Sequence, residues 1–128
     1  TGSAIYNYLS SKYIDKFFYI ISSKKNQKTV NNNVKFYKNL NKKILSQKNL
    51  IINCTPLGSN LSKEFFDKSP IPSNFFSIIN KKTLIFDIVY SPKVTKLNKI
   101  CKNKKIQFIS GLSMVKFQAK KGLKLIFN

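Results

Sequence analysis

A carboxylate and a phenol stand together at the end of an apolar run, and they are the first candidates for chemistry in this sequence. The run from Leu84 to Val89 is rich in branched and aromatic side chains and is interrupted only by Asp87. Such a run is typical of a strand buried on both faces of a parallel sheet. Asp87 and Tyr90 therefore fall at or just past the carboxyl end of that strand, where open α/β sheets bind ligands. A carboxylate in this position needs hydrogen-bond donors, because burying an unpaired charge is costly.

Apolar runs of this kind alternate with helical patterns along the 128 residues. We predict strands over 16–21, 50–53, 84–89 and 106–109, and helices starting near Gly2 and covering 26–39, 92–103 and 111–127. Pro92 is expected in the first turn of its helix, with Val94, Leu97 and Ile100 facing inward. This alternation predicts one domain of the α/β class, with a doubly wound parallel sheet covered on both faces.

The net charge of +20 comes from 24 lysines against four acidic residues, without a single arginine. Lys, Asn, Ile, Phe and Tyr share A/T-rich codons, so a biased genome composition explains their abundance here. A surface selected for nucleic acid would usually keep arginine for bidentate contacts to phosphate and guanine. We attribute the charge to composition, and a small basic nucleic-acid-binding domain is the alternative function.

Other features narrow the class of protein further. No apolar run approaches the roughly 20 residues that a membrane-spanning helix needs, and residues 1–11 do not resemble a signal peptide. Cys54 and Cys101 lie far apart in a chain without histidine. We expect reduced, buried thiols in a cytoplasmic protein, and neither a metal site nor a membrane.

Three motifs, in this order, resemble the cofactor-binding domain of the shikimate dehydrogenase family. They are Ile51-Ile52-Asn53-Cys54-Thr55-Pro56-Leu57-Gly58, then Asp87-Ile88-Val89-Tyr90-Ser91-Pro92 with Thr95 and Leu97, then Gly111-Leu112-Ser113-Met114 with Gln118-Ala119. The family shows Asn-Ala-Thr-Pro-Leu-Gly, Asp-x-x-Tyr-x-Pro-x-x-Thr-x-Leu and Gly-x-x-Met-Leu-x-x-Gln-Ala at similar spacings. The similarity covers essentially the whole chain and implies a Rossmann-like fold.

The resemblance also implies that residues 1–128 are an NADP-binding domain truncated at both ends. Thr1 matches the last residue of the family's glycine-rich phosphate loop and is a candidate cofactor contact. The sheet would then lack its first strand and that loop, and the N-terminal substrate domain would be absent. Because the family's catalytic lysine and aspartate belong to that domain, we expect no catalytic residue here.

By the same resemblance, the loop that holds the 2′-phosphate of NADP comprises Ser23, Lys24, Lys25 and Lys28. Lysine and serine replace the arginine and asparagine that are usual there. Lysine keeps the positive charge that a phosphate needs but loses the planar guanidinium. No acidic residue occurs between Asp15 and Glu64 to pair with the free ribose of NAD, which favours NADP.

The remaining predicted contacts belong to the later motifs. Ile88 and Gly111 match positions whose main chain lies against the nicotinamide end of the cofactor, and Met114 matches a methionine near that ring. Tyr90 and Gln118 match the two residues through which this domain contacts substrate. Asp87 is expected to hold local structure and not to perform catalysis.

The activity implied for the full-length protein is the reversible, NADP-dependent reduction of 3-dehydroshikimate to shikimate in aromatic amino-acid biosynthesis. We expect the fragment alone to be inactive, and its partners to be these two metabolites and no specific nucleic acid. A cofactor-binding module without catalytic activity is a further alternative. Monomer or homodimer, and shikimate or quinate, are left open by the sequence.

Overall fold

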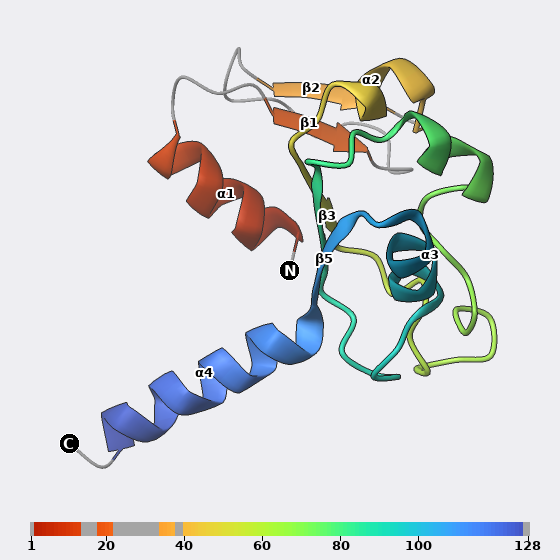
Figure 1. Ribbon diagram of the computed structural model, residues 1–128. Coiled ribbons are helices and arrows are strands. Elements are labelled where there is room, and N and C mark those ends of the chain that lie inside the picture. Colours follow the sequence, from red (N-terminus) through yellow and green to blue (C-terminus); the bar gives the residue numbers. More distant parts are fainter. Residues whose placement is uncertain (1, 14–17, 22–33, 38–39, 127–128) are drawn as a thin grey trace. The chain divides into compact units, whose positions relative to one another are not determined.

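The computed structural model describes residues 2–13, 18–21, 34–37 and 40–126 (Figure 1). Their contacts divide the chain into two compact units, residues 1–44 and 45–128. Within the described residues, no helix has both the length and the hydrophobicity that crossing a membrane requires.

The first unit contains a helix and two paired strands. Helix α1 (Gly2–Lys12) begins where the sequence predicts. Strands β1 (Phe18–Ile21) and β2 (Val34–Tyr37) are parallel, with Phe18 opposite Val34. The predicted strand over 16–21 is confirmed for 18–21. The short helix α2 (Lys42–Ser46) lies at the boundary between the units.

The predicted helix over 26–39 is wrong where it can be compared with the structure. Residues 34–37 form β2, whereas 26–33 and 38–39 lie outside the described residues. Val34, Phe36 and Tyr37 are of the branched and aromatic types that favour strands, and parallel pairing with β1 satisfies their main-chain groups. The run of asparagines before them carries no periodicity, so nothing in the local sequence marks where this strand starts.

The second unit contains a three-stranded parallel sheet in the order β3-β4-β5. Its strands are β3 (Leu50–Asn53), β4 (Leu84–Asp87) and β5 (Gln107–Ser110). The sheet and its helices confirm the predicted α/β class. Strand β3 has the predicted bounds, β4 ends two residues earlier than predicted, and β5 is shifted by one residue toward the C-terminus.

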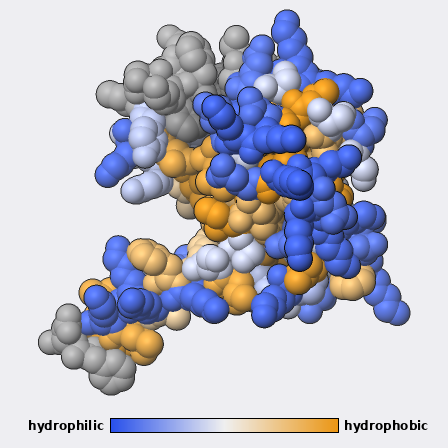
Figure 2. All heavy atoms as spheres, in the orientation of Figure 1, coloured by the Kyte–Doolittle hydropathy of each residue, from blue (hydrophilic) through white to orange (hydrophobic). Residues whose placement is uncertain are grey.

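Helices follow the last two strands, and a 3-10 helix precedes β4. They are η1 (Ser73–Ile78), α3 (Lys96–Lys104) and α4 (Gly111–Ile126). Helix α4 begins at Gly111 as predicted. In Figure 2, hydrophobic and hydrophilic residues are interspersed along α4, and Gly111 is its only buried residue among those described.

The core of the second unit lies around the middle strand. Ile85 of β4 is fully inaccessible to solvent, and Leu97 of α3 is nearly so. Both are placed in the core as the sequence predicts. The other buried hydrophobic residues of this unit are Leu45, Ile71, Phe76, Ile79, Val89, Cys101 and Ile106.

Helix α3 begins four residues later than predicted. Its N-cap is Thr95, whose Oγ1 accepts a hydrogen bond from the Asn98 N–H at 3.2 Å. A threonine in this position satisfies a main-chain donor that the first turn leaves free. Pro92 therefore precedes the helix, after a cis Ser91–Pro92 bond. Val94, predicted to face inward, is 48% exposed because it lies ahead of the helical turn.

The two cysteines give a direct test of this packing. Both thiols are free, as predicted. Burial, and then the nearby Asp87 charge, raise the pKa of Cys101 to about 12. Burial also raises the pKa of Cys54, which is only half-buried.

Because the thiolate is the reactive form, a disulfide reagent at mildly alkaline pH should label Cys54 first and Cys101 only after unfolding in urea. Cys54→Ser and Cys101→Ser assign the two phases. Labelling of Cys101 in the native chain at the rate of the unfolded chain would contradict the core described above.

Candidate functional site

The three strands of the second unit end on polar residues that lie side by side. In the parallel register, Asn53 of β3 is opposite Asp87 of β4, and Asp87 is opposite Ser110 of β5. Because the strands are parallel, these residues share one edge of the sheet. This is the edge at which open α/β sheets bind ligands.

The Asp87 carboxylate is the centre of a buried hydrogen-bond network at this edge. Its side chain is completely inaccessible to solvent. Oδ1 accepts from Asn53 Nδ2 at 2.9 Å and from the Val89 N–H at 3.1 Å, and Oδ2 accepts from Thr95 Oγ1 at 3.1 Å. The prediction that this carboxylate has hydrogen-bond donors is thereby confirmed.

Asn53 extends the same network into the loop after β3. Its Oδ1 accepts from the Thr55 N–H at 3.0 Å and from Thr55 Oγ1 at 2.7 Å. Thr55 Oγ1 in turn accepts from the Leu57 N–H at 3.3 Å. We refer to Asn53, Thr55, Asp87 and Thr95 together as the strand-end network. It ties the ends of two strands to the first turn of α3.

The electrostatics of Asp87 are a balance between burial and hydrogen bonding. Burial raises its pKa, because the ionised form loses its hydration. The hydrogen bonds from Asn53, Val89 and Thr95 act in the opposite direction and lower the pKa, but burial is the larger effect. Both oxygens are already occupied by donors, so this carboxylate holds structure and is not placed to accept a proton from a ligand.

Ile88 and Gly111, two of the predicted cofactor contacts, are brought together here. The Ile88 N–H donates to the Asn53 carbonyl at 3.2 Å, and the Gly111 N–H donates to the Val89 carbonyl at 3.3 Å. A Cβ at position 111 would lie 2.8 Å from the Val89 carbonyl carbon and closer still to the Ile88 carbonyl group. Only glycine allows this approach, which places the start of α4 against the main chain after β4.

The other predicted contacts of the second unit lie beside this junction. Tyr90 is 56% exposed, directly after the buried Val89. Met114 is half-buried in the first turn of α4, and Gln118 is exposed one turn later. Residues four apart share a helix face, so Met114 and Gln118 lie on the same side of α4. Five predicted contacts lie outside the described residues: Thr1, Ser23, Lys24, Lys25 and Lys28.

The long connection after β3 is fixed by its own main chain. Gly58 has φ +94°, a region that favours glycine, and its N–H donates to the Phe65 carbonyl at 2.8 Å. The Asn60 N–H donates to the Ser91 carbonyl at 3.1 Å, which joins this connection to the segment after β4.

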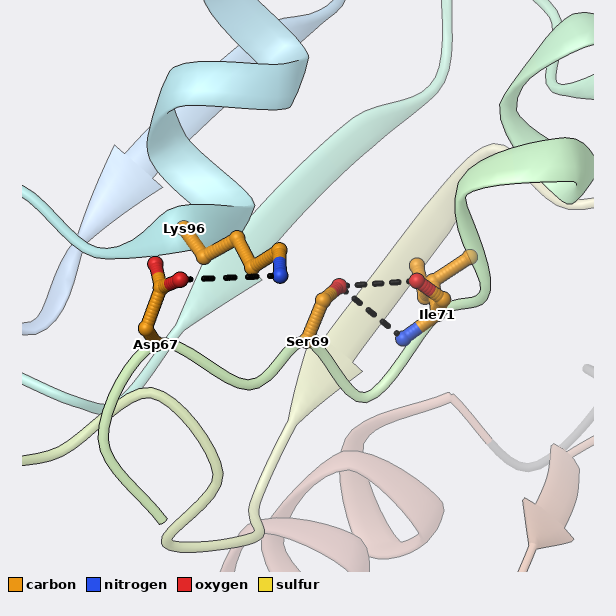
Figure 3. Close-up of polar contacts among 4 residues, drawn as sticks. All are labelled: Asp67, Ser69, Ile71 and Lys96. Atoms are coloured by element: carbon orange, nitrogen blue, oxygen red, sulfur yellow. Dashed lines mark hydrogen bonds and ion pairs between the residues drawn. The ribbon is translucent and has the colours of Figure 1, made fainter. Parts of the chain in front are cut away.

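Farther along the same connection, Ser69 Oγ donates to the Ile71 carbonyl at 2.8 Å and accepts from the Ile71 N–H at 3.2 Å (Figure 3). Asp67 forms an exposed ion pair with Lys96 at 3.7 Å (Figure 3). An exposed pair of this kind contributes at most about 1 kcal/mol.

Sequence reasoning did not anticipate the roles of Asn53 and Thr95 in this network. Asn53 ends the strand that neighbours β4, which places an amide donor beside the Asp87 carboxylate. That position is the signal in the sequence that could have revealed the role of Asn53. Thr95 is a preferred N-cap type, but Pro92 was a competing helix start. No group of three or more His, Cys, Asp or Glu residues that could hold a metal occurs in the part of the chain that the structure describes.

Comparisons with known proteins agree with this geometry. No protein-family model matches the chain. A protein named shikimate dehydrogenase (NADP(+)) from Prochlorococcus marinus strain MIT 9301 is 33% identical over 90 residues, covering 70% of this chain and 32% of the relative. Its counterpart from P. marinus subsp. pastoris is 35% identical over 88 residues, covering 68% and 30%. This chain is homologous to part of shikimate dehydrogenase. It spans about a third of the length of these relatives.

Solved structures show the same fold. Shikimate dehydrogenase 1 from Peptoclostridium difficile superposes with a TM-score of 0.68 at 23% identity, over 95% of this chain and 43% of that one. A chorismate mutase/shikimate 5-dehydrogenase fusion protein from Clostridium acetobutylicum gives a TM-score of 0.65 at 21% identity, over 95% and 41%. The predicted Rossmann-like fold is therefore confirmed.

Two glycines of α4 form a matched pair that tests the junction at Gly111. Gly111→Ala forces a Cβ into the main chain of Ile88 and Val89, and overpacking of this kind costs about 1–3 kcal/mol. Gly122→Ala meets no atom within 4 Å and should stabilise the helix by roughly 0.5–1 kcal/mol. Urea unfolding of both variants measures the two effects. Equal stability of Gly111→Ala and the natural chain would contradict the close approach.

A pH series with Asp87→Asn tests the burial of the carboxylate. The pKa of Asp87 in the folded chain is raised above its ordinary value of 3.8. Its contribution to stability is therefore fully present below 3.8 and is lost as pH rises through the folded value. The free energy of unfolding of the natural chain should therefore fall relative to that of the variant as pH rises from 3.8 through the raised pKa of Asp87 in the folded chain. A difference that grows in favour of the natural chain as pH rises would show that hydrogen bonding outweighs burial.

Proposed function

We propose that this chain is the NADP-binding part of a shikimate dehydrogenase, which reduces 3-dehydroshikimate reversibly to shikimate. One observation carries the proposal: the three motifs that resemble the family meet at the carboxyl edge of one sheet. Asn53 of the first motif bonds to Asp87 of the second. Gly111 of the third bonds to Val89 of the second. The homologous relatives bear the name shikimate dehydrogenase (NADP(+)), which supports both the reaction and the cofactor.

The residues at this edge suit the nicotinamide end of such a cofactor. The cofactor supplies the hydride, and the protein positions and orients the reactants. We assign Ile88 and Gly111 to main-chain contacts near the nicotinamide, and the half-buried Met114 to packing against it. Tyr90 and Gln118 are exposed on the adjoining segments, where both can reach a substrate. We assign no catalytic residue, because Asp87 uses both its oxygens within the protein.

The phosphate end of the cofactor is assigned to the first unit. We propose contacts from Thr1, Ser23, Lys24, Lys25 and Lys28, with the lysines supplying the charge for the 2′-phosphate. We further propose that both units, residues 1–128, belong to one cofactor-binding domain. The partners are then shikimate and 3-dehydroshikimate, and the two free thiols suit a cytoplasmic enzyme.

Calorimetric titration with NADP and NAD, at moderate salt, tests this function in the protein encoded by the full reading frame. We expect NADP to bind more tightly than NAD. Lys24→Ala should weaken NADP binding by roughly tenfold to a hundredfold and leave NAD binding unchanged, because a charge-assisted phosphate contact contributes about 1.5–3 kcal/mol.

Lys63→Ala is the matched control, since it removes one exposed lysine from the connection after β3. Equal binding of NADP, NAD and short DNA, abolished in each case by salt, would overturn the dehydrogenase assignment. It would leave lysine charge as the only determinant and favour a nucleic-acid-binding domain.

A further inference from the structure

We propose that Asp87 is the positioning residue of this site, holding the main chain of residues 87–89 in the one conformation that accepts the nicotinamide end of the cofactor. The inference rests on the proposed function, because it concerns how that same site is kept in shape. Asp87 acts through Ile88 and Gly111 and does not itself touch the cofactor. Three features of the structure support this role.

The first feature is the origin of the donors. Asn53 comes from the end of β3, the Val89 N–H from the segment after β4, and Thr95 from the cap of α3. A single carboxylate therefore holds three segments of the chain against one another. Hydrogen bonds to an ionised acceptor are about twice as strong as neutral ones, so neutralising Asp87 weakens all three together.

The second feature is the way the main chain is fixed between Asp87 and Tyr90. The bond from the Val89 N–H to Asp87 Oδ1 spans two residues, as in an Asx-turn, and encloses Ile88. The Ile88 N–H is held by Asn53, and the Val89 carbonyl accepts from Gly111. The Ile88 carbonyl then lies against the start of α4. A change at Asp87 is therefore transmitted directly to both predicted nicotinamide contacts.

The third feature is the inaccessibility of Asp87 itself. Its side chain has no solvent exposure, whereas Ile88 is half-buried and Tyr90 is 56% exposed. A ligand at the edge of the sheet can meet the residues that Asp87 holds but cannot reach its carboxylate. Its effect on the reaction must therefore pass through their positions.

The test compares variants of the strand-end network with a destabilised control, in the protein encoded by the full reading frame. Asp87→Asn keeps the shape of the side chain but removes the charge. Thr95→Val removes one donor, and Thr95→Ser keeps it. Ile79→Ala is the control, because Ile79 is buried in the core and lies after η1, outside the network. Melting temperature, KM for NADP and kcat are measured for each.

We expect Asp87→Asn to raise the KM for NADP by roughly tenfold at a temperature where it is folded, and Thr95→Val to raise it less. Thr95→Ser should restore the natural value. Ile79→Ala should lower the melting temperature with an unchanged KM. An Asp87→Asn protein that is destabilised like Ile79→Ala but keeps the natural KM would overturn the positioning role. If Asp87→Asn fails to fold, the contrast between Thr95→Val and Thr95→Ser decides in its place.

Hydrogen exchange separates a failure of this inference from a failure of the proposed function. In Asp87→Asn, the amides of Ile88, Val89 and Gly111 should lose protection, while that of Ile85 in the same sheet keeps it. This readout needs neither cofactor nor activity. Unchanged exchange at the three amides would overturn the positioning role even in an active enzyme. An inactive natural protein that binds no NADP would instead overturn the proposed function.

Discussion

A buried carboxylate that must be supplied with donors is the constraint on which the second unit depends. Asp87 ends the middle strand of the sheet, where water cannot reach it. The chain satisfies it with an amide, a main-chain N–H and a hydroxyl from three different segments. Because each donor must arrive at hydrogen-bond distance, the segments that follow β3 and β4 and the start of α3 have little freedom in where they lie.

Close main-chain packing at the start of α4 adds a second constraint on the same segment. The main chain that Asp87 holds is also the surface on which Gly111 rests, and no side chain larger than hydrogen fits between them. The main chain of Ile88 and Val89 is therefore fixed both by the hydrogen bonds around the Asp87 carboxylate and by close packing against Gly111. The result is an edge of the sheet whose shape is determined from both sides, as a site for an oriented cofactor requires.

The net charge of this chain is unrelated to the residue types that form its strand-end network. The charge of +20 is its most unusual overall property, yet the strand-end network is built from Asn, Thr and a single Asp. Homology to part of shikimate dehydrogenase, over about a third of the length of the relatives, agrees with the family that the short motifs indicate. The hydrogen bonds of this network thus involve none of the lysines that give the chain its charge.

The sequence alone determined the α/β class, the strand from Leu50 to Asn53, the helix that opens at Gly111, and the need of Asp87 for donors. Each follows from local pattern or from the cost of burying charge. Tertiary structure decided the rest: β2 forms because β1 pairs with it, and α3 starts at Lys96 because Thr95 caps it while also serving Asp87. The contact of Gly111 with Ile88 joins residues far apart in the chain, so no local pattern contains it. Hydrogen bonding and packing across segments are properties of the folded chain, and they are what shape the site.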